Sequence, residues 1–132
     1  MGFKEIRHTA DWALLVWGKD IESLFINSAQ GMYSLMGTQP NRSYKENKSI
    51  TIQGDDHESL LVAFLSELLF IAEFEKVLYE EINLVAEERV LNAQLAGYGI
   101  LSIQKQIKAV TFHNLEIIKS DGLFQTEIVF DV

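Results

Sequence analysis

The segment 56–74 constrains the fold most, because a helix built from it would be apolar on nearly every side. Its leucines and phenylalanines recur at spacings of three and four, the period of an α-helix. A helix with so wide an apolar surface needs protein around it rather than solvent along one face. We therefore expect it in the middle of the fold, with these side chains in the core rather than lining a ligand pocket: Leu60, Leu61, Phe64, Leu65, Leu68, Leu69, Phe70, Ile71 and Ala72.

A second helix is predicted over residues 20–36. Asp20 suits the N-cap position, and Gly37 can end the helix in the left-handed region. One face carries Ile21, Leu24, Phe25, Ala29, Met32, Leu35 and Met36. At the start of the 56–74 helix, Asp55 and Glu58 have the spacing of a capping box.

Alternation of apolar and polar residues predicts strands elsewhere in the chain. They cover 3–8, 12–17, 49–53, 77–86, 89–96, 106–118 and 123–132, with loops or turns at 37–42, 95–99 and 119–122. Helices do not alternate regularly with strands, which disfavours a parallel sheet. The pattern predicts an α+β fold in one domain spanning 1–132, with two main helices packed on a largely antiparallel sheet.

Composition narrows the function classes. The formal net charge of −8 is opposite to the basic surface that nucleic-acid binding usually requires, and by itself it needs no explanation beyond solubility. The chain has no cysteine, which excludes disulfides, thiolate catalysis and sulfur-ligated zinc. The longest apolar run, 60–65, is too short to span a membrane, and no signal core is found at the start. We expect a soluble, cytoplasmic protein.

Three short segments carry polar residues at the ends of predicted strands. His8 and Asp11 lie in the turn between the first two strands, where Asp11 could bind a metal or form an Asx turn. Lys108 interrupts an apolar strand and could reach a phosphate or carboxylate, or only protect a sheet edge. Asp131 precedes the terminal carboxylate of Val132, so two hard oxygen anions that suit Mg²⁺, Mn²⁺ or Ca²⁺ lie within one residue.

Together these segments resemble the archease family. The resemblance lies in 8–11 (His-Thr-Ala-Asp), 107–111 (Ile-Lys-Ala-Val-Thr) and 130–132 (Phe-Asp-Val), and it extends over essentially the whole chain. The chain departs from the family pattern at Gly97-Tyr98, where many archeases carry Gly-Glu.

The resemblance implies an accessory protein rather than an enzyme. Archease-like proteins assist an RtcB-type RNA ligase in its own guanylylation and in repeated turnover during tRNA splicing or RNA repair. The resemblance implies that Asp11, Asp131 and Val132 bind a divalent metal (Ca, Mg or Mn), and that Lys108 and His8 are functional. From the net charge and the short apolar runs we expect neither stable direct nucleic-acid binding nor membrane association.

Two other function classes stay open at this point. A small metal-dependent hydrolase could use Asp11 and Asp131 directly, although the sequence offers no convincing nucleophile or general base. A metal-independent interaction module could instead dock its acidic surface on a basic partner. Turnover of phosphate esters by the protein alone would indicate the first. Partner activation that survives chelation would indicate the second.

Overall fold

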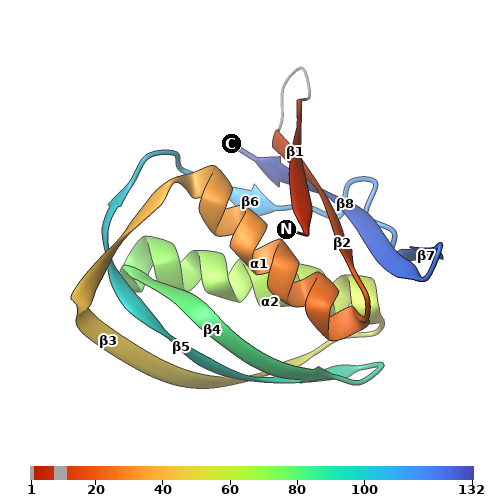
Figure 1. Cartoon of the computed structure of the whole chain (residues 1–132), viewed down its shortest axis with the longest axis horizontal. Helices are drawn as coiled ribbons and strands as arrows, with labels where there is room; N and C mark the ends of the chain where they lie inside the picture. The colour runs from red at the N-terminus through yellow and green to blue at the C-terminus, as the bar shows by residue number, and fades with distance from the viewer. Residues whose placement is uncertain (1, 8–11) are drawn as a thin grey trace.

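The chain folds into two antiparallel sheets with two helices between them (Figure 1). The computed structural model describes residues 2–7 and 12–132. The larger sheet has the strand order β1-β2-β8-β6, with β7 also paired to β8, and the smaller sheet has the order β3-β5-β4. The strands are β1 (Phe3–Arg7), β2 (Trp12–Gly18), β3 (Thr38–Gln53), β4 (Val77–Ala86), β5 (Val90–Ile103), β6 (Ala109–Val110), β7 (Ile118–Ser120) and β8 (Leu123–Asp131). The predicted α+β class is confirmed, with two sheets.

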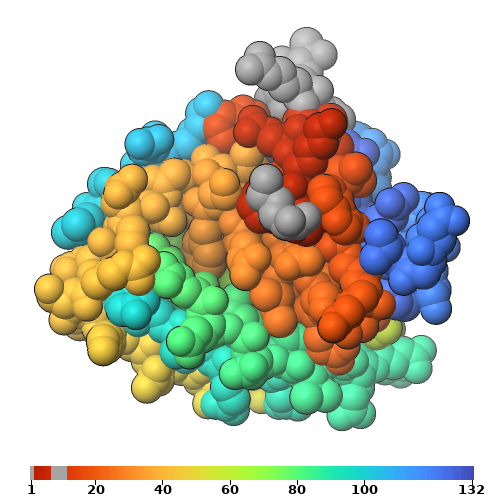
Figure 2. Space-filling view, viewed as in Figure 1, coloured from red at the N-terminus to blue at the C-terminus, as the bar shows by residue number. Residues whose placement is uncertain are grey.

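The central helix is α2 (His57–Phe70), which contacts β3 of the smaller sheet and β6 of the larger one. This position explains why its sequence is apolar on nearly every side. The other helix, α1 (Ile21–Met36), packs on β1 and β2 on one side and on β4 on the other. Figure 2 shows β1 and α1 next to each other on one face of the molecule. The helices meet through Phe25 and Phe64, whose fully buried rings stack with centroids 6.1 Å apart.

Each helix begins at an aspartate. The Asp20 carboxylate accepts a hydrogen bond of 2.7 Å from the Ser23 N–H, and Asp56 accepts one of the same length from Ser59. The cap of α2 is therefore Asp56 rather than the predicted Asp55. Hydrogen bonds from the Ser23 side chain and N–H hold the pKa of Asp20 below its usual value. A carboxyl group whose pKa is lowered by folding stabilises the fold at neutral pH, and this contribution is lost as pH falls through the folded-state pKa.

Two segments predicted as loops or turns are parts of strands in the structure. The stretch around Pro40 is part of the long strand β3 rather than a loop, because β3 is an edge strand with register shifts beside Pro40, where a missing N–H is tolerated. Residues 95–99 are likewise not a turn but the middle of β5. Gly97 lies there opposite Tyr79 next to a bulge in β4, and a Cβ on Gly97 would overlap the Leu78 carbonyl.

The end of the central helix also differs from prediction. After Phe70 the chain continues as a single π-helical segment, η1 (Ile71–Glu75), which ends at Lys76 in the left-handed region. Ile71 and Ala72 are fully buried as expected, whereas Phe70 is 51% exposed. Phe70 therefore lies outside the core. In the described part of the chain, no helix combines the length and apolar character needed to cross a membrane.

Replacing Phe64 by alanine is expected to lower the free energy of unfolding by about 3–5 kcal/mol, because it removes the ring at the contact between the helices. The half-exposed Phe70 on the same helix provides the matched control, and Phe70→Ala should cost much less. Urea denaturation of both variants measures the difference. Equal losses would show that α2 is not buried as described.

Candidate functional site

The candidate site lies where β2, β6 and β8 come together at one end of the larger sheet. Phe130, near the end of β8, is opposite Trp12 of β2 on one side and Val110 of β6 on the other. The Phe130 ring is fully buried. This burial fixes the last residues of the chain beside the first residues of β2, and Figure 1 shows the C-terminus next to the β1–β2 pair.

Asp131 directly follows this anchor and its side chain is exposed. The backbone carbonyl of Asp131 accepts a hydrogen bond of 2.7 Å from the Lys108 N–H, so that oxygen is already engaged. Val132 is half-buried and packs against the core. Alternation along this strand predicts Ile128 and Phe130 on the core face and Val129 and Asp131 on the other. Ile128 and Phe130 are buried and Asp131 is exposed as predicted, but Val129 is buried as well. The carboxylate of Asp131 is thus available for a ligand.

The structure brings Lys108 to Asp131, but not within a long strand. Residues 106–118 were predicted as one strand, whereas only Ala109–Val110 pair with β8 as β6, and β7 begins at Ile118. Directly after β6, Thr111 donates both its N–H and its hydroxyl to the Val129 carbonyl, at 3.1 and 2.9 Å. Lys108 is exposed and directly follows the buried Ile107, so its ammonium faces solvent at the edge of the site.

Two of the predicted residues, His8 and Asp11, lie outside the described residues. The first residue of β2, Trp12, directly follows Asp11 in the sequence. Among residues 2–7 and 12–132, no three histidine or acidic side chains converge in a way that would hold a metal. Of the predicted ligands, Asp131 and Val132 lie in the described part of the chain. Carboxylate oxygens are the hard donors that Ca²⁺, Mg²⁺ and Mn²⁺ prefer.

Lys105 also lies in this region, although the sequence analysis predicted no functional role for it. Its Nζ lies 3.3 Å from the centre of the Trp12 ring, a cation–π contact. Its N–H donates to the Met36 carbonyl at the end of α1, which fixes the segment leading to Lys108. Two exposed lysines thus lie at this end of the sheet. The only sequence signal was the spacing of three between Lys105 and Lys108, because the contact with Trp12 depends on tertiary structure.

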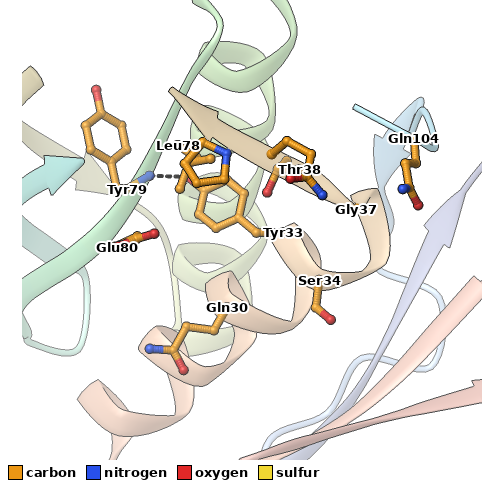
Figure 3. Close-up of a pocket in the computed structure, with 11 residues that line it drawn as sticks. Gln30, Tyr33, Ser34, Gly37, Thr38, Leu78, Tyr79, Glu80 and Gln104 are labelled. Carbon is orange, nitrogen blue, oxygen red and sulfur yellow. Dashed lines mark hydrogen bonds between the residues drawn. The ribbon is translucent and has the colours of Figure 1, made fainter. Parts of the chain in front are cut away.

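A separate pocket of about 480 Å³ lies between the end of α1 and β4 (Figure 3). The hydroxyl of Tyr33 accepts a hydrogen bond of 3.3 Å from the Tyr79 N–H in its wall. Burial raises the pKa of Tyr33 and raises that of Tyr79 to about 12, so both phenols are neutral at physiological pH. Glu80 at this pocket is paired with Arg42 at 3.0 Å.

The fold and the segment pattern together define a small α+β domain with polar residues gathered at the chain end, and comparison with known proteins identifies the family. The model of the Archease protein family matches residues 3–132. The chain belongs to this family. It is 31% identical to the archease of Methanothermobacter thermautotrophicus over 138 residues, covering 99% of both chains. It is 32% identical to the archease of Methanosarcina barkeri, covering 98% of this chain and 95% of that protein.

Solved structures have the same fold. The solution structure of Methanobacterium thermoautotrophicum protein 1598 matches with a TM-score of 0.71 and 27% identity, and 99% of each chain is covered. The crystal structure of an archease from Thermotoga maritima, described as a possible chaperone, matches with a TM-score of 0.73. That match covers 98% of this chain and 96% of the other at 22% identity, so it supports the fold alone.

Proposed function

We propose that the protein is an accessory factor that activates an RtcB-type RNA ligase and is not itself an enzyme. Its membership of the archease family supports this assignment. The observation that carries it is the placement of Lys108 and Asp131, which the backbone hydrogen bond between them holds together at one exposed end of the larger sheet. Both residues have exposed side chains, and exposed charged groups suit contact with a partner's active site.

In this proposal Asp11, Asp131 and Val132 bind a divalent cation. The Asp131 carbonyl is engaged by Lys108, so the Asp131 carboxylate and the terminal group of Val132 are the oxygen donors at this chain end. Three protein ligands leave Ca²⁺, Mg²⁺ or Mn²⁺ under-coordinated, so water or a group of the ligase completes the shell. The bound ion would supply positive charge close to the ligase nucleotide during guanylylation.

Lys108 has a distinct role as a mobile point charge. Its backbone is fixed by the Asp131 carbonyl while its side chain extends into solvent. An ammonium on a flexible stem can reach phosphate oxygens or a carboxylate of the ligase. His8 lies in the same signature segment as Asp11, and we assign it to the contact with the ligase. RNA is then held by the ligase, which is consistent with the acidic net charge of −8.

Asp131→Asn is expected to weaken divalent-cation binding at least about tenfold, because one charged donor of a small set becomes neutral. Asp11→Ala should have a similar effect. Asp121 offers the control, since it is an exposed aspartate in the turn before β8, and Asp121→Asn should bind as the unmodified protein does. Isothermal titration with Ca²⁺ and Mn²⁺ measures all three. Unchanged affinity in the Asp131 variant would remove that residue from the ligand set.

Lys108→Ala is expected to abolish most of the ligase activation while leaving the melting temperature within a few degrees of the original, because the side chain is exposed. Lys45→Ala, which removes another exposed lysine from β3, serves as the control. The assay follows transfer of labelled guanylate to the ligase with and without each variant. Full activation by Lys108→Ala would contradict the assigned role, and loss of folding would make Lys108 structural.

A further inference from the structure

A pair of exposed phenylalanines lies at the end of the central helix. Phe70 is 51% and Phe74 is 74% exposed, and their ring centroids are 4.8 Å apart. Phe74 belongs to η1, and π-helical segments of this kind occur often at functional sites. Exposed aromatic pairs beside a hollow are characteristic of protein–protein contacts. The pair is therefore a candidate docking surface.

The hollow beside these rings has a volume of about 410 Å³. One wall is formed by α2 and η1, and the other by the segment that leads into β6. Lys108 lies in this second wall, so the pocket adjoins the chain-end site but is formed by different residues. Its lining is mostly apolar, with Glu73 and Lys108 as the charged side chains.

Glu73 is the acidic residue that lines the pocket. Its Oε2 accepts a hydrogen bond of 3.2 Å from the Gln106 side chain. Its Oε1 is shielded from solvent and has no hydrogen-bond partner in the described part of the chain. Leaving a shielded carboxylate oxygen without a hydrogen bond lowers the stability of the fold, because no protein donor replaces the water that the oxygen has lost. The exposed Gln106 side chain occupies Oε2, and its rotation would free that oxygen for an incoming donor.

We propose that this pocket, formed around Phe70, Glu73 and Phe74, receives an arginine side chain of a protein partner. A guanidinium is planar, stacks on aromatic faces and presents paired N–H donors that match a carboxylate. It would replace the neutral bond from Gln106 with charge-assisted bonds and would also compensate the Glu73 charge. The net charge of −8 favours such a cationic segment over an acidic one.

Other occupants fit less well. A leucine would leave Oε1 unpaired, and an uncharged donor such as a nucleobase edge would leave the carboxylate charge uncompensated. A lysine ammonium would supply the charge without the planar stacking surface. Lys108 in the opposite wall is exposed, so its ammonium can turn toward solvent or toward an acceptor next to the arginine. All residues that line the pocket belong to this chain, so arginine binding there can be tested without the ligase.

The test is an NMR titration of the ¹⁵N-labelled protein with the capped tripeptide Gly-Arg-Gly. The matched probes carry citrulline, lysine or leucine in place of arginine, and guanosine monophosphate serves as the nucleobase probe. We expect the arginine peptide to shift the amide signals of Phe70, Glu73, Phe74 and Lys108, and to bind at least about fivefold more tightly than every other probe. Equal binding of the citrulline peptide, or tighter binding of the leucine peptide or the nucleotide, would overturn the proposal.

Variants test the pocket residues in the same titration. Glu73→Gln should weaken arginine binding about tenfold, and Phe74→Ala about threefold, while the melting temperature of Glu73→Gln stays equal or rises because an unpaired charge is removed. Glu75→Gln is the control, since Glu75 pairs with Lys48 at 3.8 Å and does not line this pocket. Arginine binding that is unchanged in both Glu73→Gln and Phe74→Ala would contradict the assignment.

Discussion

The burial of Phe130 in the larger sheet determines where the chain-end site lies. Its ring is fully buried, and its strand is paired on both sides, with Trp12 on β2 and Val110 on β6. Burying a phenylalanine contributes about 1.5–3 kcal/mol, enough to hold a strand end that would otherwise fray. With Phe130 fixed, the alternation of the strand turns Asp131 outward, and the Lys108 N–H holds the Asp131 carbonyl. The exposed charges therefore project from a rigid base.

The fold was largely predictable, because hydrophobic periodicity reports burial directly. The all-round apolar surface of α2 predicted its central position, and Asp20 and Gly37 marked the limits of α1 correctly. Periodicity failed where tertiary contacts decide. Pro40 suggested a loop, yet an edge strand accommodates it. Phe70 continued the apolar pattern of α2, yet it is half-exposed although Ile71 and Ala72 after it are buried. Helical periodicity cannot indicate which position of a nearly all-apolar helix the sheets leave uncovered.

The site was predictable only in part, because tertiary pairing decides which of its residues become neighbours. Asp131 and Lys108 were candidates because they are charged residues within or at the end of predicted apolar strands. Strand alternation also predicted that Asp131 faces outward, and its side chain is exposed. That they are neighbours depends on the pairing of β6 with β8, whereas the sequence predicted Lys108 inside a longer strand. The contacts of Lys105 with Trp12, and of Glu73 with Gln106, join residues far apart in the chain. Such long-range pairs produce no periodic pattern in the sequence, so they can be identified only from the folded structure.

We propose that a divalent cation binds at the end of β8. Paramagnetic Mn²⁺ tests it directly, because it broadens the NMR signals of nearby amides in a distance-dependent manner. We expect substoichiometric Mn²⁺ to broaden first the amides of Lys108, Ala109, Asp131 and Val132, and Ca²⁺ to reverse the effect by competition. Broadening centred elsewhere, for example on the acidic residues Glu87 and Glu88 between β4 and β5, would contradict cation binding at the end of β8.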